Sequence, residues 1–314
     1  MRDSDIGRWT HPATILVATD LSDLDHLMPF ALEEAGETGA RLILLHALSS
    51  SATITADAAG MPYYDTVGAL EIADQMLRPW CEAAIRRGIR CDPLVREGNP
   101  TQQIAAAVRQ FQADRLLLGT RSRSMIGKLL IGSVAEQVLR SVYLPVITVG
   151  PEAHLPVDTS RERIVLHATT LRETSRPSAA LACQIATAQR SKLVLLHVLP
   201  PIAEMERKGL PTGLDSAAMR ELSALASETG MGCCSYIEPV VAHGSPSIEI
   251  LALAHERRAN LIVLGSTHRS AFERLARNRT IYRVLAHARC PVLTLREPQA
   301  MPRETHAESV AAHH

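Results

Sequence analysis

The sequence predicts an α/β fold in which two doubly wound, parallel, five-stranded sheets follow one another along the chain. Two observations support this fold class. Apolar runs rich in β-branched residues alternate with segments of helical periodicity, which is typical of parallel sheets covered by helices. A series of strand and turn motifs also occurs twice, and 314 residues are enough for two domains of ordinary size.

The composition indicates a globular protein with an aliphatic core. Hydrophobic residues make up 46% of the chain and aromatic residues only 3%, while 33 basic side chains balance 33 acidic ones. Nucleic-acid binding proteins usually carry a basic face with interleaved aromatic residues, so no nucleic-acid partner is expected. No apolar run approaches the roughly 18 to 20 residues that span a bilayer, so no membrane partner is expected either.

The first residues and the cysteines bear on the cellular compartment. Residues 1–9 contain acidic side chains and lack the apolar centre of a secretory signal. The six cysteines show no framework spacing, and the adjacent Cys233 and Cys234 lack the second pair that a metal site would need. We therefore expect a cytoplasmic protein without a metal held by these cysteines.

The first half begins with two predicted strands on either side of a helix. A buried strand over residues 13–20 ends on Asp20, and helical spacing over 24–38 precedes a second strand over 41–48. Residues 49–65 lack periodicity and are predicted to form a loop. A longer helix follows, with apolar side chains on one face at Ile72, Met76, Trp80 and Ala84.

Prolines mark two later strands as edge strands. The strand predicted over residues 90–98 contains Pro93, and the one over 144–149 contains Pro145. Proline lacks the backbone N–H that a central strand needs, so both strands fit the edge of a sheet. Between them, Asn99 followed by proline predicts a helix start with an asparagine N-cap.

Residues 116–139 combine a buried strand, a turn and a helix start. The strand ends at Gly119, and Ser133 with Glu136 predicts a capping box at the helix. The helix amides and nearby basic side chains would converge on one mouth. Such a mouth favours phosphates, because unpaired amides and the helix dipole both attract negative charge. An ordinary strand-turn-helix connection without a ligand is the alternative interpretation.

An internal repeat divides the chain into two domains. We predict domain 1 over residues 1–153, domain 2 over 154–314, and a disordered tail over 297–314, which has no apolar period. Three motif pairs share an offset of 146 residues, namely Gly98-Asn99-Pro100 with Gly244-Ser245-Pro246, the strand ending at Gly119 with that ending at Gly265, and Leu144 to Val149 with Cys290 to Leu295.

These repeated motifs resemble those of the universal stress protein (UspA) family in its tandem, two-domain form. The resemblance covers residues 13–150 and 162–296 and includes the strand from Ile15 to Asp20 and the pair Leu45-His46. Its most specific feature is the nucleotide loop, which in the family has glycine, two residues, glycine, nine residues, glycine, and serine or threonine. Those places are occupied here by Gly119, Ser122, Gly132 and Ser133, so a serine stands where the second glycine belongs.

The resemblance implies an adenine-nucleotide α-hydrolase-like fold with strand order 3-2-1-4-5 in each sheet. Family members often dimerise through the last strand. The two halves of this chain are therefore expected to pack as an intramolecular pseudo-dimer, and a homodimer of such chains is compatible with the same pattern.

The resemblance also implies that domain 1 binds ATP or a related adenine nucleotide, with Mg²⁺ as a further ligand. Asp20 would lie beside the adenosine, and Ser133 would reach a phosphate. The residues that would line the phosphate site are Gly119, Arg121, Ser122, Gly132, Ser133 and Val134.

Domain 2 departs from the loop pattern, so we expect it to support the pseudo-dimer without binding ATP in the family manner. Larger or charged side chains occupy its loop positions, and a threonine replaces the first carboxylate. The residues concerned are His268, Asn278, Arg279 and either Thr169 or Thr170.

Three functions fit these expectations. The first is a stress-responsive sensor or regulator that binds an adenine nucleotide and is not an enzyme. The second is a protein-interaction module of the same fold that binds no nucleotide. The third is a slow ATP hydrolase, for which the sequence offers no evident general base. His46 and His197 occupy equivalent places in the repeat and are assigned to packing or local hydrogen bonding.

Overall fold

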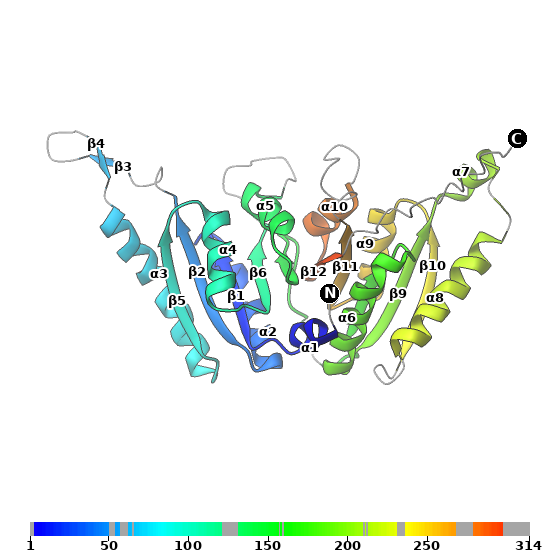
Figure 1. Ribbon diagram of the computed structural model, residues 1–314, viewed down its shortest axis with the longest axis horizontal. Coiled ribbons are helices and arrows are strands. Elements are labelled where there is room, and N and C mark those ends of the chain that lie inside the picture. The colour runs from blue at the N-terminus through cyan, green and yellow to red at the C-terminus, as the bar shows by residue number, and fades with distance from the viewer. Residues whose placement is uncertain are drawn as a thin grey trace, which may run out of the picture.

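Both halves of the chain contribute to one continuous ten-stranded sheet that carries helices on its two faces (Figure 1). The structure is a computed structural model. It describes residues 3–49, 54–56, 62–64, 66–120, 131–156, 158, 160–209, 211, 213–230, 236–267 and 279–297.

The first half supplies five parallel strands. They are β1 (Thr14–Thr19), β2 (Arg41–Leu48), β5 (Cys91–Glu97), β6 (Arg115–Gly119) and β7 (Val146–Val149). The main helices between them are α2 (Leu24–Thr38), α3 (Thr66–Arg86), α4 (Pro100–Gln110) and α5 (Ser133–Ser141). The spatial order β5-β2-β1-β6-β7 confirms the expected order 3-2-1-4-5.

The second half repeats this arrangement. Its strands are β8 (Ile164–Ala168), β9 (Lys192–Leu199), β10 (Ile237–His243), β11 (Leu261–Thr267) and β12 (Val292–Glu297), in the order β10-β9-β8-β11-β12. Its helices are α6 (Arg176–Ala188), α7 (Ile202–Arg207), α8 (Leu214–Gly230), α9 (Pro246–Glu256) and α10 (Arg279–His287).

Alternation along each strand sends side chains into two cores, one on each face of the sheet. Ile15 and Val17 of β1 belong to the core that α2, α3, α6 and α8 cover. Leu16 and Ala18 belong to the core beneath α4, α5, α9 and α10. Because both faces are covered, the central strands consist of continuous apolar runs, as the sequence indicated.

The two halves join through their last strands, which confirms the expected pseudo-dimer. β7 and β12 pair antiparallel, with Ile147 opposite Leu293. The hydroxyl of Thr148 donates to the Val292 carbonyl at 3.1 Å, and the equivalent Thr294 hydroxyl lies 3.3 Å from the Val146 carbonyl. This reciprocity is the mark of a pseudo-twofold axis. β7 and β12 are therefore edges only within their own halves, and the edges of the whole sheet are β5 and β10.

An N-terminal helix, α1 (Asp3–Thr10), was not predicted from the sequence. It packs against α6 of the second half, where the Thr10 hydroxyl donates to Gln184 Oε1 at 2.9 Å. Ile6 is buried in the core, and Arg8 Nε donates to Asp114 at 2.8 Å. These contacts join α1 to both halves of the molecule.

For residues 49–86, one expectation was wrong and a second was wrong at two of its four residues. The predicted loop over 49–65 contains a short antiparallel pair, β3 (Ile54–Ala56) and β4 (Pro62–Tyr64). The face of α3 that carries Ile72 and Met76 is exposed to solvent, with 60% and 45% of these side chains accessible. The same predicted face is right at Ala84, which is buried, and at Trp80, which packs against the core, while the other buried residues of the helix are Ala73, Leu77 and Cys81.

Two further differences concern the cysteines and the end of the chain. Cys81 and Cys91 are distant from any motif, yet their sulfur atoms lie 2.8 Å apart in the core. The contact with Cys81, together with burial, raises the pKa of Cys91.

Glu297 is a buried residue of β12 and is not part of a tail. The remainder of the predicted tail lies outside the described residues.

Candidate functional site

The candidate site of domain 1 lies at the carboxyl ends of β1 and β6. These strands pair in parallel, with Ala18 opposite Leu118, so Asp20 and Gly119 reach the same edge of the sheet. β1 has β2 on one side and β6 on the other, which makes this edge the point where the strand order reverses. Open α/β sheets bind ligands at such a switch point, outside the carboxyl ends of the strands.

The turn after β1 holds Asp20 at the surface. Its Oδ1 accepts hydrogen bonds from the Ser22 amide at 2.9 Å and from the Ser22 hydroxyl at 2.5 Å. Leu21 has a φ of 71°, and its amide donates to the Thr19 hydroxyl at 2.9 Å. This tight turn leaves the Asp20 side chain exposed with acceptor capacity for a ligand.

Asp23 is the residue of this edge whose role the sequence did not reveal. Its side chain is buried against Gly119, and its Oδ1 accepts a hydrogen bond from the Thr19 hydroxyl at 2.7 Å. Burial raises the pKa of this carboxyl group. Asp23 thus ties the start of α2 to the ends of β1 and β6. The only signal in the sequence was an acidic residue at a helix start, which is common for other reasons.

We expect Gly119→Ala to disturb this arrangement. A Cβ at residue 119 would overlap the Asp23 carboxylate, so the variant should lose about 1–3 kcal/mol of unfolding free energy through overpacking. Gly132→Ala is the control, because φ −56° and ψ 144° at Gly132 suit any L residue, and its loss should stay below about 1 kcal/mol. Urea denaturation of the two variants tests this order, and equal stability would contradict it.

The helix start near Ser133 differs from the predicted capping box. Gly132 is the N-cap and Ser133 is the first helical residue, so the N-cap position supplies no capping side chain to α5. Glu136 forms an ion pair with Arg140 instead of reaching back, while its amide donates to the Gly132 carbonyl at 3.0 Å. The first amides of a helix have no partner within the helix. A glycine N-cap therefore leaves them accessible to an external acceptor, and Val134 beside them is 36% exposed.

Two predicted site residues, Arg121 and Ser122, lie outside the described residues. The structure follows the strand only to Thr120, whose amide donates to the Val149 carbonyl at 3.1 Å. Asp20, Gly119, Gly132, Ser133 and Val134 are described. They belong to β6, the turn after β1 and the start of α5.

The corresponding edge of domain 2 has the same turn conformation after its first strand but different side chains. Leu171 has a φ of 58° and its amide donates to the Thr169 hydroxyl, which reproduces the turn at Leu21. This register assigns Thr170 to the place of Asp20, and the Thr170 hydroxyl lies 2.7 Å from that of Ser175. The helix α10 begins with Arg279 at the position of Ser133. His268 and Asn278 lie outside the described residues.

A second buried carboxylate fills the space beside Gly265 in domain 2. Glu297 from the end of β12 contacts this glycine and accepts a hydrogen bond from the Ser178 hydroxyl. Burial raises the pKa of Glu297 to about 7. In domain 1 the equivalent space beside Gly119 holds Asp23, which comes from a different element.

The two histidines of the repeat have the structural role that their position indicated. Nδ1 of His46 lies 3.0 Å from the Thr19 carbonyl, and Nδ1 of His197 lies 2.9 Å from the Thr169 carbonyl. Each histidine therefore connects the second strand of its sheet to the end of the first. Among the described residues no cluster of histidine, cysteine and carboxylate side chains could hold a metal ion. No helix in the same part of the chain has the length and apolar character to cross a membrane.

Comparison with known proteins finds universal stress proteins that each match less than half of this chain. The universal stress protein in the QAH/OAS sulfhydrylase 3′ region of Thermus aquaticus is 32% identical over 140 residues, which is 43% of this chain and 97% of that protein. The universal stress protein E homolog of Haemophilus influenzae is 30% identical over 155 residues, which is 46% of this chain and 50% of that protein.

Solved structures share the fold of the whole chain. A universal stress protein from Archaeoglobus fulgidus superposes with a TM-score of 0.68 over 90% of this chain and 98% of that one, at 21% identity. The universal stress protein family itself matches residues 13–150 and 162–296, one match for each repeat. The chain therefore belongs to the universal stress protein family, as a tandem member with two such domains.

Proposed function

We propose that domain 1 binds ATP or a related adenine nucleotide and that the protein acts as a stress-responsive sensor or regulator. The observation that carries the proposal is the start of α5, whose glycine N-cap supplies no capping side chain. A phosphate there would accept hydrogen bonds from the amides of Ser133 and Val134 and would meet the positive end of the helix dipole. Asp20 on the neighbouring strand end would accept hydrogen bonds from the adenosine hydroxyl or amino groups.

Domain 2 serves in this proposal as a partner that holds the pseudo-dimer without binding the nucleotide. Thr170 carries no charge where Asp20 does, and α10 starts with an arginine where α5 has Ser133. One nucleotide per chain is therefore expected.

A titration of the full chain with ATP, followed by calorimetry, tests the proposal. We expect saturable binding with one site per chain, weakened at least about tenfold by Gly132→Asp, which would set a carboxylate against the phosphate. Asp20→Ala should weaken binding as well. Thr170→Ala, at the equivalent position of domain 2, is the matched control and should leave the affinity unchanged. No saturable binding at millimolar ATP, or equal losses in Asp20→Ala and Thr170→Ala, would contradict the proposal.

We further propose that the protein binds the nucleotide without hydrolysing it and that Mg²⁺ binds together with the phosphates of ATP. Slow hydrolysis is the competing possibility for the same site. Phosphate release that follows the ATP affinity through Asp20→Ala and Gly132→Asp would favour a hydrolase. Release that is the same in the parent protein and both variants would come from a contaminant.

A protein-interaction module without a nucleotide is the second candidate function. The exposed apolar side chains of α3 favour it, because Val67, Ile72 and Met76 are 69%, 60% and 45% exposed on one helix. Surfaces of this kind often contact other proteins. The ATP titration separates the two candidates, since the module requires no saturable nucleotide binding.

A further inference from the structure

The pseudo-twofold axis creates two equivalent grooves between the halves, and the helix α1 fills one of them. The helix lies against α6 and the start of β6, with Ile6 and Trp9 directed toward the core. Asp114 at the base of this groove accepts hydrogen bonds from the amides of Ala13 and Thr14, at 2.9 and 3.1 Å, and also binds Arg8. The apolar side of α1 therefore closes the first groove.

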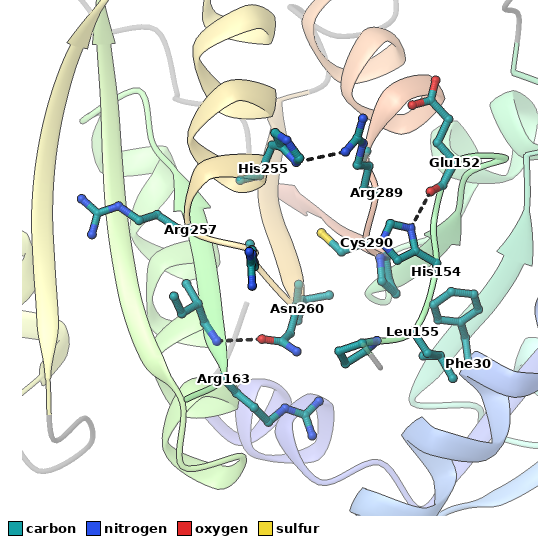
Figure 2. Close-up of a pocket in the computed structure, with 18 of the residues that line it drawn as sticks. Phe30, Glu152, His154, Leu155, Arg163, His255, Arg257, Asn260, Arg289 and Cys290 are labelled. Carbon is teal, nitrogen blue, oxygen red and sulfur yellow. Dashed lines mark hydrogen bonds between the residues drawn. The ribbon is translucent and has the colours of Figure 1, made fainter. Parts of the chain in front are cut away.

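The second groove has the same base but a different occupant. Asn260 takes the role of Asp114, since its Oδ1 accepts a hydrogen bond from the Ile164 amide at 2.9 Å. The segment that precedes β8, as α1 precedes β1, is the connection between the domains, and its described residues 153–156 and 158 are not helical. A cavity of about 990 Å³ remains between this connection, α2 and the ends of α9 and α10 (Figure 2).

Apolar side chains from both halves line part of this cavity. Phe30 of α2 and Leu117 and Ile147 of the domain 1 sheet lie behind its walls as buried core residues, whereas Leu155 of the connection and Leu251 of α9 are only partly buried. In the filled groove, Ile6 of α1 is buried at 7% exposure. The apolar surface that the second groove offers to a ligand therefore comes from Leu155 and Leu251.

Charged side chains line the cavity on two walls and along the connection, which carries Glu162 and two carboxylates that have partners, Glu152 with His287 and Asp158 with Arg161. The acidic wall on α2 is neutralised, because Arg163 pairs with Glu33 and Glu37 while Arg115 pairs with Glu34. The opposite wall is basic and carries three arginines, namely Arg258 just after α9, Arg283 in the middle of α10 and Arg289 between α10 and β12.

The basic wall retains its charge. Arg289 donates to Nδ1 of His255 at 3.2 Å, and in the described part of the chain no carboxylate forms an ion pair with any of the three arginines. Figure 2 shows His255 and Arg289 on one side of the cavity, with Phe30 and Leu155 on the opposite side. A ligand in this space would meet cations at one end and apolar side chains at the other.

We propose that this interdomain cavity binds an organic anion with an apolar body, of the class of medium-chain carboxylates. The carboxylate would pair with Arg283 and Arg289, and the chain would cover the apolar surface of Leu155 and Leu251. The volume lies within the range of small-molecule sites, and arginine provides the paired donors that a carboxylate accepts. The cavity includes the amino-end residues of β8, β11 and β12, whereas the nucleotide site uses the carboxyl ends of β1 and β6, so the proposal is independent of nucleotide binding.

Decanoate is a suitable probe, measured by calorimetry on the full chain below its micelle concentration. We expect saturable binding of one decanoate per chain, unchanged by saturating ATP. The double variant Arg283→Gln/Arg289→Gln should lower the affinity at least about tenfold, because it removes both paired cations. Ala252→Trp, on the exposed face of α9 that lines the cavity, should also weaken binding by occupying the space.

The matched control is Arg109→Gln, which changes the position of domain 1 that corresponds to His255, near the groove that α1 fills. It should bind decanoate like the parent protein. Circular dichroism establishes that each variant is folded before binding is compared. Absence of saturable binding, equal affinity in the parent and the double arginine variant, or displacement of decanoate by ATP would each overturn the proposal.

Discussion

Arg115→Leu is expected to lower the free energy of unfolding by about 3 kcal/mol, because it strands a carboxylate between β6 and α2. Arg115 is 2% exposed and pairs with Glu34, which is 13% exposed, and it also donates to the Trp9 carbonyl at the end of α1. Burial lowers the pKa of Arg115 to about 10, so the side chain remains charged at neutral pH. Urea denaturation followed by tryptophan fluorescence measures the loss, since Trp9 reports on the docking of α1.

The double variant Arg115→Leu/Glu34→Gln is the control for this prediction. The corresponding positions of domain 2 are occupied by Leu261 and Gln184, so this combination already exists in the repeat. Removing the carboxylate together with the guanidinium should restore most of the lost stability. If the double variant is as unstable as Arg115→Leu alone, the cost does not come from an unpaired Glu34.

His167→Val is expected to change how stability depends on pH. His167 is fully buried in the central strand β8, and its Nδ1 lies 3.0 Å from the Val263 carbonyl. Burial lowers its pKa to about 4, whereas an unfolded chain binds the proton near 6.5. As the pH falls, this histidine is therefore protonated in the unfolded chain before it is protonated in the folded protein. Between pH 6.5 and pH 4 this difference lowers the free energy of unfolding by about 1.4 kcal/mol per pH unit.

Valine occupies the corresponding position in β1, at Val17, and does not titrate. Between pH 7 and pH 5 the stability of His167→Val should therefore rise relative to the parent by about 2 kcal/mol. Urea denaturation of both proteins at pH 7, 6 and 5 gives this difference directly. Parallel stability curves would show that the ring is solvated in the folded protein.

Glu297→Gln provides a control of opposite sign. Burial raises the pKa of this carboxyl group to about 7 from an ordinary value of 4.5. Its contribution to the free energy of unfolding is therefore lost as the pH rises from 4.5 to 7. Removing Glu297 should therefore stabilise the protein relative to the parent toward pH 7, whereas removing His167 should do so toward pH 5. The two contributions oppose each other between pH 4.5 and 6.5 in the parent protein.

The regular elements were predictable because apolar periodicity dominates them. The predicted helix 24–38 and strand 41–48 have the same bounds as α2 and β2, and Asn99 caps α4 by accepting a hydrogen bond from the Gln102 amide at 3.2 Å. These features depend on neighbours within a few residues. The buried face of α3 was not predictable in this way, since the helix carries apolar residues on more than one side and packs through small ones.

The candidate site likewise has features that the sequence predicted and features that depend on tertiary contacts. Its strand ends, glycines and first carboxylate were assigned from motif and repeat, and the structure brings Asp20 and Gly119 to one edge as expected. The N-cap is Gly132 and not Ser133, because the extended ψ of 144° at Gly132 makes Ser133 the first helical residue. The role of Asp23 depends on a tertiary contact, because its side chain packs against Gly119 of β6.

The sequence by itself determined that the protein has two copies of one α/β domain and that the second copy has lost the residues of the family loop, while the pseudo-dimer was implied by the family resemblance. Repeated local patterns carry that information. Only the tertiary structure decided that α1 fills one groove between the halves and that a cavity remains in the other. These features depend on contacts such as Arg8 with Asp114 and Thr10 with Gln184, between residues more than 100 positions apart, which no local pattern can specify.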